Sequence, residues 1–389
     1  MKYHVSNWII AVSLILALVN FSCVQNPENA EHKAASNTSE VKELTPEEQK
    51  WLDFLITRDE INLNFKEDEP RRLLSFENFS GTKEEWKQQT KEKFSELIGF
   101  QYTQAGVVKF LRSNEFDGVE IPALKMRISD DLTIHAYLLK PAGREPYKSA
   151  VMAIHGHGRV EPAIGQYDDY HHKFAWELAR DGHLVLAPEL RGFSKLNNMA
   201  AHDTLTILDY WEGRYQFTLA TDGFLYGNTI IGTTVEDLVR WENWLAETYF
   251  VEEIDVCGIS YGGDLTIYYP VFSERVDRIF CSGSMGSFTW IFRSCYNAPA
   301  HCIPHVLNWM DRSDIAGLNY PSPIMIHYGE YDTPGKDNAS AANNPSGPTA
   351  YQELRSIYRA FGNEDLLSWL VTPDSHHEMD ISALLKFLN

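Results

Sequence analysis

Apolar positions along the chain follow two different periods. From residue 120 onward, short apolar runs typical of buried strands alternate with longer stretches whose apolar residues fall on one helical face. In the stretch 234–248, for example, Val235, Leu238, Trp241 and Leu245 share such a face. The predicted strands are 121–127, 132–139, 150–154, 183–187, 254–258, 279–282, 323–328 and 367–371. The predicted helices are 172–180, 234–248, 261–272, 349–361 and 380–387.

This alternation predicts an α/β fold with a mostly parallel central sheet and helices on both of its faces. The first two strands flank the turn 129–131 and therefore form a hairpin, which adds an antiparallel edge. Two longer segments, 194–231 and 283–320, interrupt the alternation after predicted strand ends. Because ligand-binding loops gather at the carboxyl ends of parallel strands, we expect both insertions to form a cap that faces the substrate.

Residues 1–23 predict an export signal. Lys2 supplies a positive start, and the apolar run 8–19 is too short for a typical membrane span but suits a signal peptide. A small residue before Cys23 resembles the bacterial lipoprotein signal, in which the cysteine is lipidated, although that signal prefers Leu where Asn20 stands. The resemblance implies an exported, periplasmic or cell-surface protein that is lipid-anchored at Cys23. Ordinary cleavage and an uncleaved anchor are the alternatives.

Three further parts follow this signal. Residues 24–44 lack an apolar period and predict a polar linker, and residues 45–119 predict a helical extension. Within the extension, Thr45-Pro46-Glu47-Glu48 is a capped helix start, and a second helix is expected from Thr82 to Ile98. Residues 120–389 form the main domain. We find no internal repeat.

Composition excludes several classes of protein. Of the 389 residues, 44% are hydrophobic and 13% are aromatic, which is enough for a buried core. A formal net charge of −20 disfavours nucleic acid and anionic lipid surfaces as partners, so a membrane contact is expected only through the anchor. No pattern calls for a cofactor, and the oligomeric state is left open.

The cysteines outside the signal fall into two groups. Cys257 and Cys281 lie in strand patterns and are expected to be buried thiols. Cys295 and Cys302 lie seven positions apart in a segment without a helical or strand period. In an oxidising compartment these two can either pair or stay reduced.

The strongest chemical motif is Gly258-Ile259-Ser260-Tyr261-Gly262, between a predicted strand and a predicted helix. A nucleophilic serine at such a strand–turn–helix junction needs residues without bulk two positions before and after it. An ordinary glycine turn is the competing interpretation. The flanking elements favour Ser260 as a nucleophile.

A serine nucleophile requires a base and an acid that orients the base. In folds with this junction the chain order is serine, acid, histidine. The histidines downstream of Ser260 are His301, His305, His327, His376 and His377. Only the last two follow the final predicted strand, and we favour His377 over His376. Asp332 follows the strand 323–328 and is the predicted acid, with Glu330 as the fallback.

Two backbone amides are expected to stabilise the tetrahedral intermediate. One belongs to Tyr261, directly after the nucleophile. The other belongs to His157, in the loop His155-Gly156-His157-Gly158 after the strand 150–154. A metal site is the weaker interpretation of that loop, because His171 and His172 lie nearby but no Cys or Asp stands at ligand spacing.

Together these motifs resemble the dienelactone-hydrolase-related, acetyl-xylan-esterase-like branch of the α/β hydrolases. The resemblance rests on 155–158, 187–193, 258–263, 302–305, 314–316 and 329–332, and it extends over 120–389. It implies the α/β-hydrolase fold and the roles assigned above to Ser260, Asp332, His377, His157 and Tyr261. It also implies that Arg191 braces the structure. The departures are Glu189, where Asp is usual, and the small polar run 335–348 after the acid.

The favoured function is therefore an exported serine esterase that deacylates a carbohydrate, such as an acetylated polysaccharide or oligosaccharide. Aromatic residues in the insertions can stack on sugars or form the core of the cap: Tyr210, Trp211, Tyr215, Trp290 and Trp309. One alternative is a serine peptidase related to prolyl oligopeptidases, although too few residues precede 120 for their propeller domain. The other is a surface glycan-binding lipoprotein without catalysis.

Overall fold

The computed structural model describes residues 45, 71–102, 104–143, 146–193, 215–289, 299–332 and 346–389. The chain divides into two compact units, Met1–Glu69 and Pro70–Asn389, and every element given below belongs to the second. The predicted signal peptide with Cys23 and the predicted linker lie outside the described residues. In the part of the chain that the structure describes, no helix is long and apolar enough to cross a membrane.

A single nine-stranded sheet runs through the second unit, in the order β1-β2-β3-β5-β4-β6-β7-β8-β9. Pairing is antiparallel from β1 to β5 along this order and parallel from β5 to β9. The strands are β1 (Val107–Phe116), β2 (Val119–Arg127), β3 (Thr133–Pro141), β4 (Ser149–Ile154), β5 (Leu184–Pro188), β6 (Glu253–Ile259), β7 (Val276–Ser282), β8 (Ile324–Gly329) and β9 (Leu367–Thr372). The predicted α/β class and the antiparallel edge are confirmed.

Helices cover both faces of this sheet. The α-helices are α4 (Lys83–Ile98), α5 (Phe174–Asp181), α7 (Tyr215–Leu225), α8 (Ile230–Tyr249), α9 (Tyr261–Tyr268), α11 (Arg312–Gly317), α12 (Gly347–Phe361) and α13 (Ile381–Leu388). Short 3₁₀ helices are η3 (Tyr269–Phe272), η4 (Pro299–His301), η5 (Val306–Asn308) and η7 (Glu364–Leu366). Thus α7 lies in the first predicted insertion, and η4, η5 and α11 lie in the second.

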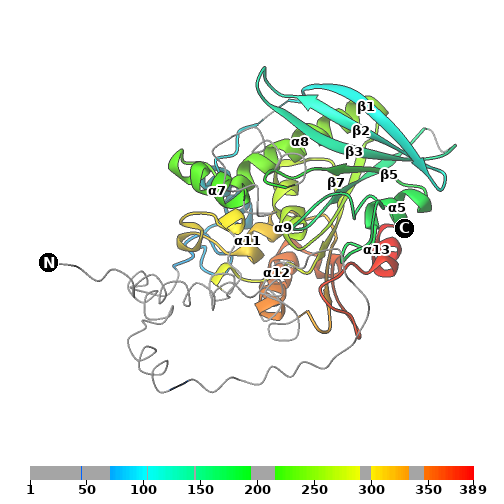
Figure 1. The fold of residues 1–389 in the computed structure, drawn as a ribbon. Coiled ribbons are helices and arrows are strands. Elements are labelled where there is room, and N and C mark those ends of the chain that lie inside the picture. Colours follow the sequence, from blue (N-terminus) through cyan, green and yellow to red (C-terminus); the bar gives the residue numbers. More distant parts are fainter. Residues whose placement is uncertain are drawn as a thin grey trace. The chain divides into compact units, whose positions relative to one another are not determined.

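The alternation of side chains along β4 explains why the sheet has two cores. Ala150, Met152 and Ile154 join a buried cluster with residues of α4, α8 and α9, whereas Val151 and Ala153 join a second cluster with residues of α5 and α13. Figure 1 shows α5 and α13 close together on one side of the strands, with α8 and α9 on the other. A strand buried on both faces reads as a continuous apolar run, as the sequence predicts.

β1 was not predicted, and it moves the start of the sheet ahead of residue 120. Nine of its ten residues are exposed, so the strand has no buried face and no apolar period to detect. The predicted helix after Thr82 is present as α4, where the Thr82 hydroxyl and the Glu85 carboxylate form a capping box. The helix predicted to start at Thr45 lies almost entirely outside the described residues, so it stays a prediction.

Candidate active site

Ser260 occupies a strained turn between β6 and α9. Its φ of 59° and ψ of −124° lie in a region that non-glycine residues rarely adopt. A Cβ added at Gly262 would lie 2.1 Å from the Ile154 carbonyl oxygen, and one at Gly258 would lie 2.7 Å from the Gly262 carbonyl oxygen. Both glycines are therefore required for the turn, as expected of a nucleophile elbow. The Ser260 amide donates to the Ser282 carbonyl over 3.0 Å, which ties the turn to β7.

The structure brings the predicted acid and base together. Nδ1 of His377, in the loop after β9, lies 2.9 Å from Oδ2 of Asp332, in the loop after β8. Their side chains are 9% and 1% exposed. His376 is instead exposed beside the Tyr331 ring, and Glu330 accepts a hydrogen bond from the Asp374 amide. Of the alternatives raised by the sequence, the geometry favours His377 and Asp332.

Gly283, directly after β7, makes room for this pair. Its φ is +57°, and a Cβ there would lie 2.7 Å from Cε1 and 2.9 Å from Nδ1 of His377, and 3.2 Å from Oδ2 of Asp332. The sequence analysis did not identify this residue. Its signal is a glycine immediately after a buried strand that neighbours the elbow strand, which marks a close approach of another group.

The loop 155–158 lies against the elbow, as predicted for the second amide donor. A Cβ at Gly156 would lie 2.8 Å from the Ile259 carbonyl oxygen and 3.0 Å from Cβ of Ser260. The Gly156 amide donates to Nε2 of His171 over 2.9 Å, while Nδ1 of His171 lies 2.7 Å from a carboxylate oxygen of Asp169. His171 therefore fixes the loop. It was weighed only as a metal ligand in the sequence.

Tyr170 connects that loop to the base. Its hydroxyl donates to the His157 carbonyl over 2.7 Å, and its ring stacks on His377 with centroids 5.6 Å apart. The Met379 amide donates to the Tyr170 carbonyl, which holds the His377 loop from the other side. Tyr170 is a positioning residue that sequence reasoning missed.

The His155 ring and the ring nitrogens of His157 are buried, and both imidazoles are neutral. Burial lowers the pKa of His155 to about 3, and its Nε2 accepts from the Leu190 amide. Burial, and then the charges of His301 and His377, hold the pKa of His157 well below its usual value. Among the described residues, no cluster of three or more His, Cys, Asp or Glu side chains is placed to bind a metal ion.

A buried polar chain supports the strand ends beneath the acid. Nε2 of His327 lies 3.0 Å from the Thr372 hydroxyl, which donates to Asp380, and Nδ1 lies 2.8 Å from the Ser282 hydroxyl. Burial lowers the pKa of His327 to about 4, so the ring is neutral. The chain connects the carboxyl ends of β7, β8 and β9 and fixes their spacing.

Other predicted residues have structural roles or lie outside the description. Arg191 forms a bidentate pair with Asp237, at 2.6 and 3.0 Å, and thus braces the loop after β5 against α8. Trp309 packs on the core beneath the ammonium group of Lys93. Tyr210, Trp211, Trp290, Cys295, the Tyr215 side chain and most of the run 335–348 lie outside the described residues. The Cys295–Cys302 pairing therefore stays a prediction.

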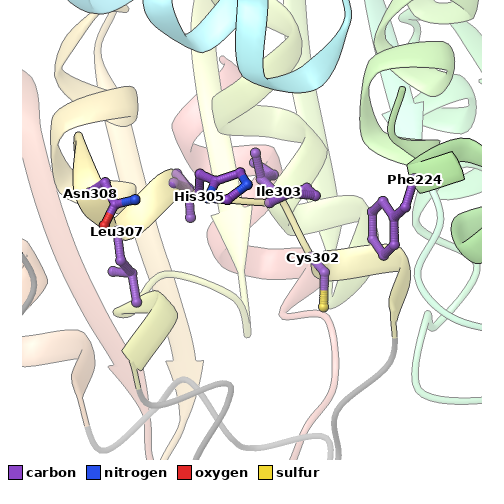
Figure 2. A pocket seen from close by; sticks show the side chains of 8 residues that line it. Phe224, Cys302, Ile303, His305, Leu307 and Asn308 are labelled. Carbon is purple, nitrogen blue, oxygen red and sulfur yellow. The ribbon is translucent and has the colours of Figure 1, made fainter. Parts of the chain in front are cut away.

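A pocket of about 330 Å³ is lined by Phe224 of α7 and by residues 302–308 (Figure 2). Its lining includes none of Ser260, Asp332 and His377.

Comparison with known proteins identifies the fold. No family model and no curated protein matches the sequence. A solved structure from Bacteroides fragilis, assigned as an acetyl xylan esterase, is similar with a TM-score of 0.63 at 14% identity, covering 82% of each chain. A methylesterase gives 0.59 at 15% identity, covering 82% of this chain and 67% of the other. A glucuronoyl esterase from Solibacter usitatus gives 0.55 at 10% identity, covering 83% and 97%.

These similarities, together with the sheet order and the serine elbow, define the α/β-hydrolase fold. The predicted resemblance to the α/β hydrolases is confirmed for the fold. At such low identity the likeness establishes the fold, and the activity must be argued from the site.

Proposed function

We propose that the protein is a serine hydrolase that cleaves carboxylic esters of carbohydrates. The observation that carries this proposal is the hydrogen-bonded Asp332–His377 pair, which packs on Gly283 next to the strained Ser260 elbow. A buried acid, an imidazole and a serine at a sharp turn are the three parts that activate a hydroxyl for acyl transfer.

The chemistry follows from these positions. His377 takes the proton of the Ser260 hydroxyl as Oγ attacks the ester carbonyl carbon, and Asp332 stabilises the imidazolium. The amides of Tyr261 and His157 stabilise the negative oxygen of the intermediate. Collapse expels the alcohol, which receives the proton from His377. Water, deprotonated by His377, then releases the acid from the acyl-enzyme and restores Ser260.

Three features support a carbohydrate ester as the substrate. The similar solved structures with the same fold include an assigned acetyl xylan esterase, a methylesterase and glucuronoyl esterases. The signal-like N-terminus supports export, which brings an enzyme to polysaccharides outside the cell. The strongly acidic chain disfavours nucleic acid as an alternative partner. We also propose that Cys23 is lipidated, which a Cys23→Ser variant would test through loss of incorporated radiolabelled palmitate.

A fluorophosphonate probe tests the nucleophile directly. The wild type is expected to be labelled and to hydrolyse 4-nitrophenyl acetate, and both signals should vanish in Ser260→Ala. Ser356→Ala is the matched control, because Ser356 is exposed on α12. An unlabelled wild type that binds glycans would instead indicate a binding protein, and labelling with preferred cleavage of peptide amides would indicate a peptidase.

Acylated glycans then define the ester. Acetylated xylan, methyl-esterified pectin and glucuronoyl esters of xylan release acetate, methanol and the ester alcohol, respectively, and each product is measured directly. We expect one of them to be a better substrate than 4-nitrophenyl acetate, measured as kcat/KM. Activity confined to simple aryl esters would contradict the carbohydrate part of the proposal.

A further inference from the structure

Another deeply buried carboxylate–imidazole pair lies outside the proposed triad. His301, the last residue of η4, places Nδ1 within hydrogen-bond distance of Oδ2 of Asp264, in the first turn of α9. The two side chains are 9% and 1% exposed, as buried as His377 and Asp332. The proposed chemistry does not use this pair.

Asp264 has polar partners other than His301. The carboxylate also pairs with the guanidinium of Arg312, which is fully buried, and accepts a hydrogen bond from the Ser284 hydroxyl. Arg312 therefore already balances the negative charge. Burial lowers the pKa of His301 to about 4, so the imidazole is neutral near pH 7. Its Nδ1–H donates to Asp264, and Nε2 is left as a hydrogen-bond acceptor.

His301 lies beside the two residues assigned to the oxyanion hole. Its ring centroid is 5.0 Å from that of His157 and 5.1 Å from that of Tyr261, against which it packs edge-on. Its Nε2 is buried, and no described residue hydrogen-bonds to it. A buried acceptor without a partner is unfavourable, and a ligand that brings a donor removes that cost.

We infer that Nε2 of His301 accepts a hydrogen bond from a hydroxyl group of the substrate close to the scissile ester. This inference rests on the proposed function and assigns a residue that recognises a hydroxyl group of the carbohydrate ester. A site built around a buried acceptor discriminates against the analogue that lacks the donor, because binding that analogue leaves the acceptor unpaired. His301 is thus a specificity-determining residue.

Two variants of His301 distinguish the role of Nε2 as an acceptor from the role of Nδ1 as a donor to Asp264. In His301→Asn, the amide nitrogen takes the place of Nδ1 and nothing stands at Nε2. In His301→Gln, the longer side chain brings a carbonyl oxygen to about the position of Nε2. Two pairs of esters differ only by a hydroxyl: 2-hydroxyethyl acetate with ethyl acetate on the alcohol side, and methyl lactate with methyl propanoate on the acyl side.

The wild type is expected to prefer the hydroxylated member of one pair. His301→Asn should lower kcat/KM for that member by about tenfold and leave its plain partner within about twofold. His301→Gln should retain part of the preference. Equal losses on both members, or a preference that His301→Asn does not alter, would overturn the inference while leaving the esterase intact. A wild type that hydrolyses none of the four esters and takes no phosphonate label would overturn the proposed function and the inference with it.

A measurement on the wild type alone checks the acceptor state. Nitrogen-15 NMR of the histidine-labelled protein at pH 7, assigned by comparison with His301→Gln, should show Nδ1 protonated and Nε2 unprotonated. A protonated Nε2 would overturn the inference whatever the activity of the variants.

Discussion

The Asp332–His377 and Asp264–His301 pairs share their chemistry and burial but differ in their surroundings. Asp332 and His377 come from the loops after β8 and β9 and meet over Gly283, next to Ser260. Asp264 belongs to the helix after the elbow and shares its charge with Arg312. On the proposed mechanism, the charge of Asp332 stabilises the imidazolium of His377. In the other pair, Asp264 already shares its charge with Arg312, and burial keeps His301 a neutral acceptor.

The largest expected contrast is between the two histidines. His377→Ala should lower kcat for 4-nitrophenyl acetate by about 10⁴-fold or more, because the general base is lost. For His301→Asn, kcat should stay within about twofold of the wild-type value, because this ester lacks a hydroxyl group. His376, the neighbour of His377 in the chain, is exposed, and His376→Ala is therefore the matched control. Its kcat should equal that of the wild type. If His376→Ala were the inactive variant instead, the base would have to be reassigned.

The next largest effect is expected on stability, when the acid of the Asp264–His301 pair is replaced. Asp264→Asn leaves the buried Arg312 without its ion-pair partner and should lower the free energy of unfolding by about 3–5 kcal/mol. Urea denaturation measures this loss. The exposed Asp374→Asn is the control and should stay within about 0.5 kcal/mol. A stable Asp264→Asn protein would mean that Arg312 finds another partner, and the comparison would lose its electrostatic basis.

Gly283→Ala tests whether Gly283 positions His377 beside Asp332. The added methyl group would meet the His377 ring, so a displacement of about 1 Å should lower kcat by about 10²-fold. Gly118→Ala provides the control, because Gly118 also has a positive φ of 75° but has nothing within 4 Å of its added Cβ. Gly118→Ala should lose a similar amount of stability, because alanine is also unfavourable at this positive φ, but it should keep full activity. Equal activity of both variants would show that Gly283 does not position His377.

The smallest expected effect concerns the pH dependence of stability. Burial lowers the pKa of His155, His301 and His327 to about 3, about 4 and about 4, below the usual value of 6.5. Between those values and pH 6.5 the unfolded chain binds more protons, so the free energy of unfolding falls as the pH is lowered. Each residue contributes at most about 1.4 kcal/mol per pH unit to that fall.

His301→Asn removes one contribution of this kind. Between pH 6.5 and pH 5.5 it should lose about 1 kcal/mol less than the wild type in urea denaturation. Ser356→Ala is the control and should lose as much as the wild type, because it removes no titratable group from the exposed face of α12. An unchanged loss in His301→Asn would mean that His301 is charged in the folded protein, and the two pairs would then be alike.

The sequence predicted the strands that are buried on both faces, because their apolar runs need no knowledge of neighbours. It missed β1, whose residues face solvent. The elbow was visible because Gly258, Ser260 and Gly262 are close in the chain. The second carboxylate–imidazole pair was not visible, because Asp264 and His301 meet only through tertiary packing. Gly283 escaped for the same reason, since the ring that requires it lies far along the chain.

The positions of β8 and β9 at the end of the chain also affect how the protein gains its reactivity during synthesis. Ser260 and its turn precede Asp332 and His377, which follow the last two strands added to the sheet. Under the proposed function, a growing chain therefore carries an ordinary serine hydroxyl until β9 pairs with β8. On the proposed mechanism, this hydroxyl becomes a nucleophile only in the finished fold, and chains that lack β9 do not react with esters.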